Sequence, residues 1–322
     1  MLLSCAFATS LETPEHIRVA EALGYHRAWC YDSPALYPDV WVALALAAER
    51  TERIGLGPGV LVPSLRHPMT SAAAIATLAS MAPGRVAVAV GSGFTGARCL
   101  GRKPMRWTDV ADYVRTLRGL LRGEEVEWDG AVLRMLHPPG FAPPRPIEVE
   151  VLIAASGPKG LAAAAEVGDG VFLAGVPTGA DQFANAAVLT FGTVLDDGEP
   201  VDSPRVLAAA GHGAAVSLHA MYEWFPAALD GVPGGPAWKA MIDAMPERTR
   251  HLSLHEDHLV GVNGHDRPFI GAELLAGAAF SRDQLRERLD AFAAGGATEV
   301  AYQPAGPDIP RELEVFASVA TG

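Results

Sequence analysis

Residues 54–68 read IGLGPGVLVPSLRHP and combine an apolar strand with the residues that weaken a strand most. The isoleucine, leucine and valine side chains suit a strand that is buried on both faces. Glycine weakens a strand, and proline removes a hydrogen bond from its ladder. The stretch therefore predicts a buried strand, and it raises the question of why glycine and proline stand inside it.

Similar apolar runs alternate with helical segments along most of the chain. The expected strands begin near residues 2, 26, 54, 85, 149, 171, 205 and 299, and the 205–211 run ends at Gly211-His212. The expected helices cover 41–50, 69–81, 107–121, 180–189 and 310–320, with others starting at Thr13, Gly157, His212 and the Ser281–Gln284 capping box. Continuous apolar strands are typical of a parallel sheet buried on both faces.

Eight strand–helix units predict an α/β fold, a (β/α)₈ TIM barrel forming a single domain over residues 1–322. A doubly wound sheet is the runner-up, because strand order is invisible in the sequence. Two segments interrupt the rhythm and read as insertions, at about 123–147 and about 230–270. The first contains the turn signal Asp129-Gly130 and predicts a hairpin followed by an extended strap.

The amino-acid composition excludes some classes of binding partner. Lys and Arg total 25 against 37 Asp and Glu, a formal charge of −12, which argues against nucleic acid as a partner. Three widely spaced cysteines without a CxxC motif fit free thiols in a reducing cytoplasm. The N-terminus lacks the basic region of a signal peptide, and no apolar run is long enough to predict a membrane span. We therefore expect a cytoplasmic protein with no membrane partner.

Small residues dominate the expected carboxyl ends of the strands, where barrels carry their function. GSGFTG, residues 91–96, is compatible with a plain turn or a cofactor contact, and less so with a dinucleotide fingerprint. AASGPKG, residues 154–160, ends a strand and starts a helix whose N–H groups suit an anion, although a tight turn needs the same residues. Asp32 alone is best explained as a helix cap.

The histidines offer a different hypothesis. His251, His255 and His258 would share one face if the segment were helical, and three imidazoles can bind a transition metal. The spacing does not fit H-E-x-x-H, so histidines of the surface or of a substrate loop are the better interpretation. We assign no metal site from the sequence, and a metal-dependent barrel hydrolase is the weakest enzyme hypothesis. A barrel that only binds a ligand, without a cofactor, is less attractive still.

Together, WCYDS, the RHP that precedes a small-residue helix, PGRV before a strand and G-x-G, and AASGPKG resemble the luciferase-like monooxygenase family. The resemblance is to its deazaflavin-dependent branch, of the methylenetetrahydromethanopterin reductase type. It covers residues 1–175 well and the rest more loosely. It implies a barrel, usually homodimeric, that binds reduced coenzyme F420 or FMN at the carboxyl ends of its strands.

The resemblance also implies site residues. Asp32 is the expected catalytic and cofactor-contacting carboxylate, and Gly59-Val60 is the expected position of a strand bulge with a non-proline cis peptide. The other expected cofactor contacts are Gly91, Ser92, Gly93, Ala155, Ser156, Gly157, Ala174 and Gly175. The expected substrate contacts are Ser33, Tyr37, Phe94, Trp238 and His255.

Two departures from the branch bear on the chemistry. Several deazaflavin dehydrogenases have a histidine where this chain has Ser33, and a glutamate where it has Phe94. These changes favour a reductase or oxygenase over a sugar-phosphate dehydrogenase. We therefore expect an F420-dependent oxidoreductase that transfers a hydride to or from an unidentified small organic substrate. The alternative is an FMNH₂-dependent monooxygenase that uses O₂ and needs a separate cofactor reductase.

Overall fold

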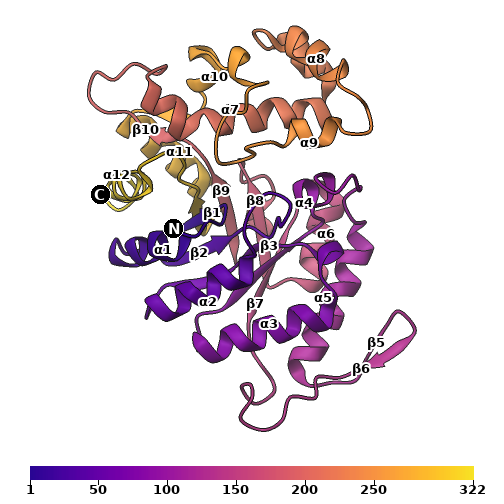
Figure 1. Ribbon diagram of the computed structural model, residues 1–322. Coiled ribbons are helices and arrows are strands. Elements are labelled where there is room, and N and C mark those ends of the chain that lie inside the picture. Colours follow the sequence, from indigo (N-terminus) through magenta and orange to yellow (C-terminus); the bar gives the residue numbers. More distant parts are fainter. The chain divides into compact units, whose positions relative to one another are not determined.

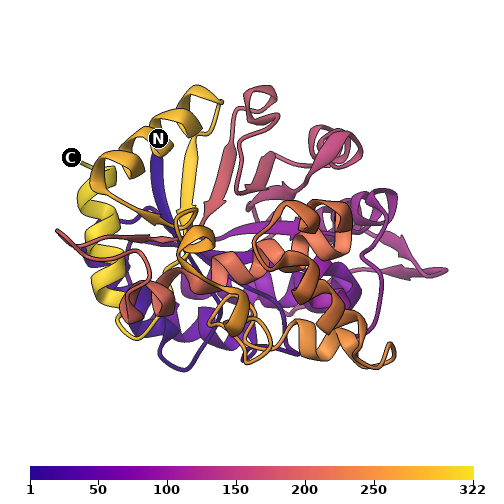
Figure 2. The same ribbon diagram turned by 90° about the horizontal axis from the view of Figure 1, so that it is seen from above.

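The computed structural model describes residues 1–322 and contains a closed barrel of eight strands, which confirms the predicted (β/α)₈ fold and excludes an open sheet. The strand order is β1-β12-β9-β8-β7-β4-β3-β2. The strands are β1 (Leu2–Phe7), β2 (Arg27–Cys30), β3 (Gly55–Leu61), β4 (Ala87–Gly91), β7 (Glu150–Ala154), β8 (Gly170–Ala174), β9 (Ala186–Thr190) and β12 (Glu299–Tyr302). Figure 2 shows the indigo β1 beside the yellow β12, where the first and last strands close the barrel.

The chain divides into two compact units. The first contains Met1–Leu189 and Phe292–Ala301, and the second contains Thr190–Ala291 and Tyr302–Gly322. Nearly all barrel residues belong to the first unit. The prediction of a single domain over residues 1–322 stays a prediction.

Helices surround the barrel strands of the first unit (Figure 1). They are α1 (Thr13–Ala22), α2 (Val40–Arg50), α3 (Pro68–Met81), α5 (Trp107–Arg122) and α6 (Gly157–Val167), with the short α4 (Phe94–Arg98), η1 (Pro63–Leu65) and η2 (Ala180–Gln182). Each long helix packs on the next one in sequence. The strands between them are almost wholly buried, which explains why they read as continuous apolar runs.

The seventh barrel strand was predicted in the wrong place. The chain forms β9 at Ala186–Thr190, where a helix was expected, and residues 205–211 lie inside the long helix α7 (Pro204–Trp224). The Ser203 hydroxyl accepts from the Val206 N–H, Pro204 starts the helix, and the alanines that follow are strong helix formers. A short buried apolar run cannot be assigned to strand or helix from its pattern alone. Gly211 and His212 are consequently helical and do not end a strand.

The predicted hairpin of the first insertion is confirmed. Strand β5 (Val126–Trp128) pairs antiparallel with β6 (Ala131–Leu133). The two turn residues have φ of 50° at Asp129 and 76° at Gly130, as a tight two-residue hairpin loop requires.

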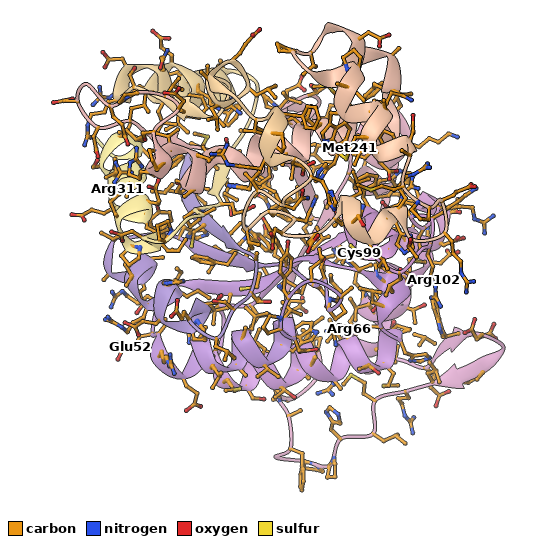
Figure 3. All side chains as sticks on the ribbon, turned by 45° about the horizontal axis from the view of Figure 1, so that its top comes forward. Glu52, Arg66, Cys99, Arg102, Met241 and Arg311 are labelled. Carbon is orange, nitrogen blue, oxygen red and sulfur yellow. The ribbon has the colours of Figure 1, made fainter.

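The second unit is mainly helical. It contains β10 (Thr193–Val194) paired with β11 (Ala279–Phe280), α7, η3 (Pro226–Gly231), α8 (Gly235–Asp243), α9 (Arg250–Leu254), η4 (Arg267–Phe269), α10 (Ala272–Leu275) and α12 (Ile309–Ala320). Trp238 and Leu218 anchor one of its apolar clusters, and Met241, labelled in Figure 3, packs against it. Helix α11 (Arg282–Ala294) begins with the predicted capping box: Ser281 N–H donates to Gln284, and Gln284 N–H donates to the Ser281 hydroxyl.

None of the helices is both long and apolar enough to cross a membrane. All three cysteines are buried free thiols.

Candidate functional site

The carboxyl end of β3 is irregular at the predicted position. Gly59 pairs with Ala89 and Leu61 pairs with Val90, so Val60 is an extra residue opposite consecutive residues of β4. The peptide bond between Gly59 and Val60 is cis. Both features confirm what the family resemblance implies for this strand.

Close packing explains the glycines in the same strand. A Cβ atom on Gly57 would lie 1.7 Å from the carbonyl oxygen of Ala87, and one on Gly59 would lie 2.9 Å from Cβ of Trp29. No side chain fits at either distance. Strand β3 therefore has apolar side chains where there is room for them, and it has glycine where atoms of neighbouring strands occupy the space.

Asp32 follows β2 and is buried in an ion pair with Arg66. The Arg66 Nε donates to Oδ2 at 2.9 Å and its Nη2 donates to Oδ1 at 2.9 Å, a bidentate arrangement. Nη2 also donates to the Asp39 carboxylate at 2.7 Å. Asp39 in turn caps α2 by accepting from the backbone N–H of Trp41. Both oxygens of Asp32 are thus committed to one guanidinium group.

Arg66 is a site residue that its motif, RHP, does not identify from the sequence alone. It follows η1 in the loop after β3 and is labelled in Figure 3. Burial alone would lower the pKa of Arg66, yet its hydrogen bonds to Asp32 and Asp39 leave that pKa above the ordinary value. Burial likewise raises the pKa of Asp39, but the bond from Arg66 brings the net value below normal. The sequence pattern that could have predicted this ion pair is an acidic residue after one strand, Asp32, and a basic residue after the neighbouring strand, Arg66.

Two expected substrate residues lie on the loop that follows Asp32. The Tyr37 N–H donates to the Ser33 carbonyl at 3.0 Å, which closes a turn. The Tyr37 ring is buried with its centroid 6.4 Å from that of Tyr31. Burial raises the pKa of the Tyr37 phenol, which keeps it a neutral hydroxyl.

Of the residues expected after the fourth strand, Gly91 ends β4, Ser92 and Gly93 form the loop, and Phe94 begins α4. Gly93 has φ of 80°, and a Cβ there would lie 2.3 Å from the Cγ1 atom of Val62. Helix α4 starts at once with Phe94, whereas the sequence predicted no helix between the fourth strand and residue 107. The loop is therefore held tightly against the end of β3.

The expected anion-binding turn joins β7 to α6. Ser156 precedes the helix, is exposed, and makes no side-chain capping bond. Gly157 has φ of 70°, and Lys159 is exposed in the first turn. Since the first N–H groups of a helix have no partner within it, this turn offers backbone donors, a hydroxyl and an ammonium group to an anion.

The pairing of neighbouring strands brings together the residues at which the loops after β4, β7 and β8 begin. Gly91 is directly opposite Ala154, the residue before Ala155, and Ala174 is opposite Leu189. Ala174 ends β8 with its side chain exposed, and Gly175 follows with φ of 78°. The predicted residues of the first unit thus form one run of strand ends with small side chains, next to the Asp32 ion pair.

The two other expected substrate residues, Trp238 and His255, belong to the second unit and are buried there. The Trp238 Nε1 donates to the Asp266 carboxylate at 2.7 Å. The assignment of Trp238 and His255 to a substrate site stays a prediction.

Three histidines of the second unit lie close together, and they are not the same three that the sequence suggested as a metal site. His255 and His258 lie with His219 of α7, and one ring nitrogen from each lies within 4.8 Å of the others. His251 is on α9 and is not part of the group. Burial lowers the pKa of His258 well below normal, and the neighbouring histidines add to this effect. His219 could not be found from spacing, because it lies on a separate helix.

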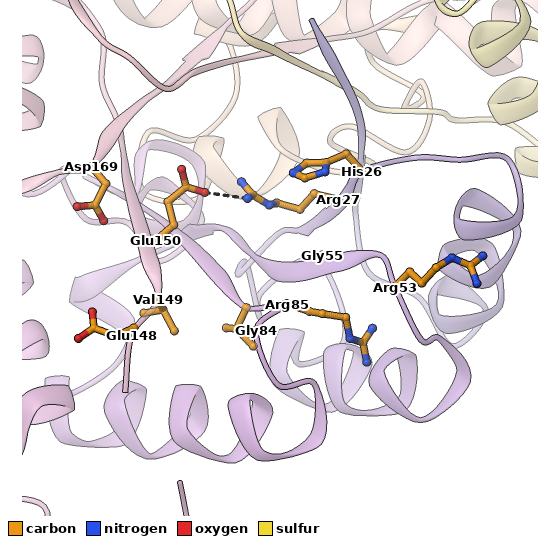
Figure 4. Close-up of a pocket in the computed structure, with 11 residues that line it drawn as sticks. His26, Arg27, Arg53, Gly55, Gly84, Arg85, Glu148, Val149, Glu150 and Asp169 are labelled. Atoms are coloured by element: carbon orange, nitrogen blue, oxygen red, sulfur yellow. Dashed lines mark hydrogen bonds and ion pairs between the residues drawn. The ribbon is translucent and has the colours of Figure 1, made fainter. Parts of the chain in front are cut away.

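A pocket of about 510 Å³ lies at the opposite, amino-terminal ends of the barrel strands (Figure 4). Its lining includes Arg27, whose Nη2 contacts Glu150 at 2.7 Å and whose Nη1 contacts Glu299 at 3.4 Å. Trp29 Nε1 also donates to Glu299. These charges are paired with one another, and this face of a barrel serves stability, so we do not place the active site here.

Comparisons with known proteins agree with this geometry. The chain is 31% identical over 167 residues to 5,10-methylenetetrahydromethanopterin reductase of Archaeoglobus fulgidus, covering 50% of this chain and 48% of that protein. It is 36% identical over 148 residues to F420-dependent glucose-6-phosphate dehydrogenase of Beutenbergia cavernae, covering 43% and 41%. The chain thus spans less than half the length of either curated relative.

One similar solved structure is the coenzyme F420-dependent tetrahydromethanopterin reductase of Methanopyrus kandleri. Its TM-score is 0.68 at 19% identity, and the match covers 98% of each chain, which supports the fold. The family model described as luciferase-like monooxygenase matches residues 9–299. The chain therefore belongs to the luciferase-like monooxygenase family.

Proposed function

We propose that this protein is a coenzyme F420-dependent oxidoreductase that transfers a hydride between the reduced deazaflavin and a small organic substrate. The observation that carries the proposal is the glycine-lined, bulged end of β3. Side chains are excluded at Gly59 and Gly93 by Trp29 and Val62, so backbone forms this part of the strand-end face. A flat ring fits such a face, and the curated relatives named above are a tetrahydromethanopterin-type reductase and an F420-dependent dehydrogenase.

The residues present fit the two ends of such a cofactor. Gly59, Val60 and Gly91 would lie against its ring system. Ser156, Gly157 and the first turn of α6 would hold its phosphate, with Ala155, Ala174 and Gly175 alongside. Lys159, which was not among the residues expected from the sequence, is exposed in the first turn of α6, and its ammonium group would attract the same phosphate. When bound, the deazaflavin supplies the hydride.

Asp32 would orient a bound group and would not transfer a proton itself. Because both of its oxygens accept from Arg66, it is better placed to orient a donor group than to carry a proton. The family resemblance implies that Ser33 and Phe94 replace a histidine and a glutamate of several deazaflavin dehydrogenases, so this part of the site would lack those acid–base groups. The positioning of two reactants by fixed backbone would then supply most of the rate enhancement, as much as about 7–11 kcal/mol in favourable systems.

Titration of the purified protein with F420 and with FMN, followed by ligand fluorescence, tests the proposal. Micromolar binding of F420 with weak or absent binding of FMN is expected. The reverse result, with oxygen uptake and oxygenated product in the presence of FMNH₂, would establish the monooxygenase alternative that the family description suggests. In that case a separate reductase would have to supply FMNH₂.

A homodimeric assembly and a cytoplasmic location complete the proposal. The cytoplasmic location is supported by three buried free thiols, which are typical of a reducing compartment. Size-exclusion chromatography with light scattering tests the dimer.

A further inference from the structure

We propose that His219, His255 and His258, none of which is a proposed cofactor residue, form a binding site for a transition-metal ion of the zinc type in the second unit. Each histidine offers one ring nitrogen, and the three nitrogens lie within 4.8 Å of one another. A zinc ion bound about 2.0–2.1 Å from each nitrogen would hold them roughly 3.4 Å apart, so each pair of nitrogens would approach by at most about 1.4 Å when the ion binds. All three rings are almost wholly buried.

Asp266 prepares His219 to be a ligand. The Nε2 atom of His219 lies 2.7 Å from Oδ2 of Asp266, and the carboxylate accepts its proton. This bond places the lone pair on Nδ1, which is buried and has no hydrogen-bond partner. Histidines that bind metals usually donate their other nitrogen to a carboxylate in this way.

Asp266 is itself fixed by groups that have no other role in the site. Trp238 Nε1 donates to its Oδ1 at 2.7 Å, and the Asn263 side chain donates to its Oδ2 at 2.9 Å. Asn263 also accepts from the backbone N–H of Asp266 at 2.8 Å. The carboxylate is therefore oriented before any ion arrives, which is what a supporting residue of a metal site requires.

The backbone beside His258 adopts an uncommon conformation. Asp257 and Leu259, on either side of it, have φ of 54° and 62°. Such a conformation is rare for a leucine and persists only when its surroundings enforce it. The Gln303 side chain donates to the Leu259 carbonyl and holds this turn. The result is that His258 faces His219 with ring centroids 5.8 Å apart.

The ligand set indicates the metal and its effect. Three imidazoles suit zinc, cobalt, nickel or copper and do not suit calcium or magnesium. An ion there would fasten α7 to the segment 255–266, two parts of the second unit that are distant in sequence. Three protein ligands leave the fourth tetrahedral position for a water molecule or another small ligand.

The test uses the full chain after treatment with a chelator. Titration with Zn²⁺ against a chromophoric chelator is expected to give one equivalent bound, and Co²⁺ is expected to give the intense visible bands of a tetrahedral site. H219Q, H255Q and H258Q should each weaken Zn²⁺ binding by at least a hundredfold. H251Q, which changes a nearby histidine outside the group, should bind as the wild type does.

X-ray absorption of the zinc-loaded wild type gives an answer that does not depend on the folding of any variant. Three imidazoles in the coordination sphere support the site. Fewer imidazoles, binding below one equivalent, or an equal loss in H251Q and H258Q would overturn the proposal, since each result points to adventitious surface binding.

Discussion

Two buried aspartates, Asp32 in the barrel unit and Asp266 in the second unit, are held in different ways. The oxygens of Asp32 accept from Arg66, a cation that no ordinary pH discharges. Those of Asp266 accept from an indole, an amide and an imidazole. The two side chains are equally inaccessible, each with an exposed fraction of 1%.

The difference shows what each site can do. A guanidinium that occupies both oxygens fixes a carboxylate and its charge in one place, as a preorganised cofactor site needs. An imidazole that donates to a carboxylate keeps its second nitrogen for another partner, as a metal ligand needs. Substitutions in both units test this contrast.

The largest effect is expected from R66M. It leaves the Asp32 carboxylate buried without its cation, a change that costs about 3–5 kcal/mol. Urea unfolding measures the loss. R106M is the matched control, because Arg106 makes the same bidentate contact with Asp109 on the surface, and it should unfold like the wild type. Equal behaviour of the two variants would show that Arg66 is not the group that stabilises Asp32.

The next largest effect is expected from G57A. The new Cβ would collide with the carbonyl oxygen of Ala87 and push β3 away from β4, at about 3 kcal/mol of stability. Urea unfolding again reports the change. Gly231 has open space around it, so G231A should be neutral. A mild G57A would mean that the two strands can separate without loss.

D266N should weaken zinc binding about ten- to a hundredfold, because an asparagine amide nitrogen cannot accept the proton of His219 Nε2. Competition with a chromophoric chelator measures the affinity. E256Q removes an exposed carboxylate from the same segment and serves as the control. If both variants bind zinc equally well, Asp266 does not orient His219.

Stability should fall as the pH is lowered, through His212. Burial lowers the pKa of His212 to about 4, against 6.5 in the unfolded chain. As the pH falls, the unfolded state therefore binds a proton before the folded state does. The contribution of His212 to the free energy of unfolding is complete above pH 6.5 and is lost as the pH falls toward 4. Between pH 7 and 5.5 the loss is about 1 kcal/mol.

Urea midpoints of metal-free wild type and H212L at the two pH values measure this loss. Because leucine does not titrate, H212L should show a smaller drop. An identical drop in both proteins would assign the pH effect to other groups, His258 among them.

The smallest effect is expected from S156A, which removes the hydrogen bond that we propose between Ser156 and the cofactor phosphate and should weaken F420 binding about threefold. Its hydroxyl makes no capping bond, so the fold should not change. T77A, on α3, is the control and should bind normally. Unchanged binding in S156A would move the phosphate away from this turn.

The sequence determined the parts that depend on a few neighbouring residues. Apolar runs, caps and turn residues predicted seven of the barrel strands, the Ser281–Gln284 capping box and the Asp129-Gly130 hairpin, because local propensity decides these features. The family resemblance added the bulge at Gly59-Val60. Where propensity was ambiguous, between residues 180 and 211, the prediction of the seventh strand was wrong.

Only the tertiary structure decided which distant side chains meet. Arg66 reaches Asp32 across 34 residues, and His219 reaches Asp266 across 47. No local pattern contains such a pair, since it forms when separate elements pack and bury both groups. The sequence determined the barrel and its small-residue strand ends, and packing decided which charges are cancelled there and which imidazoles converge.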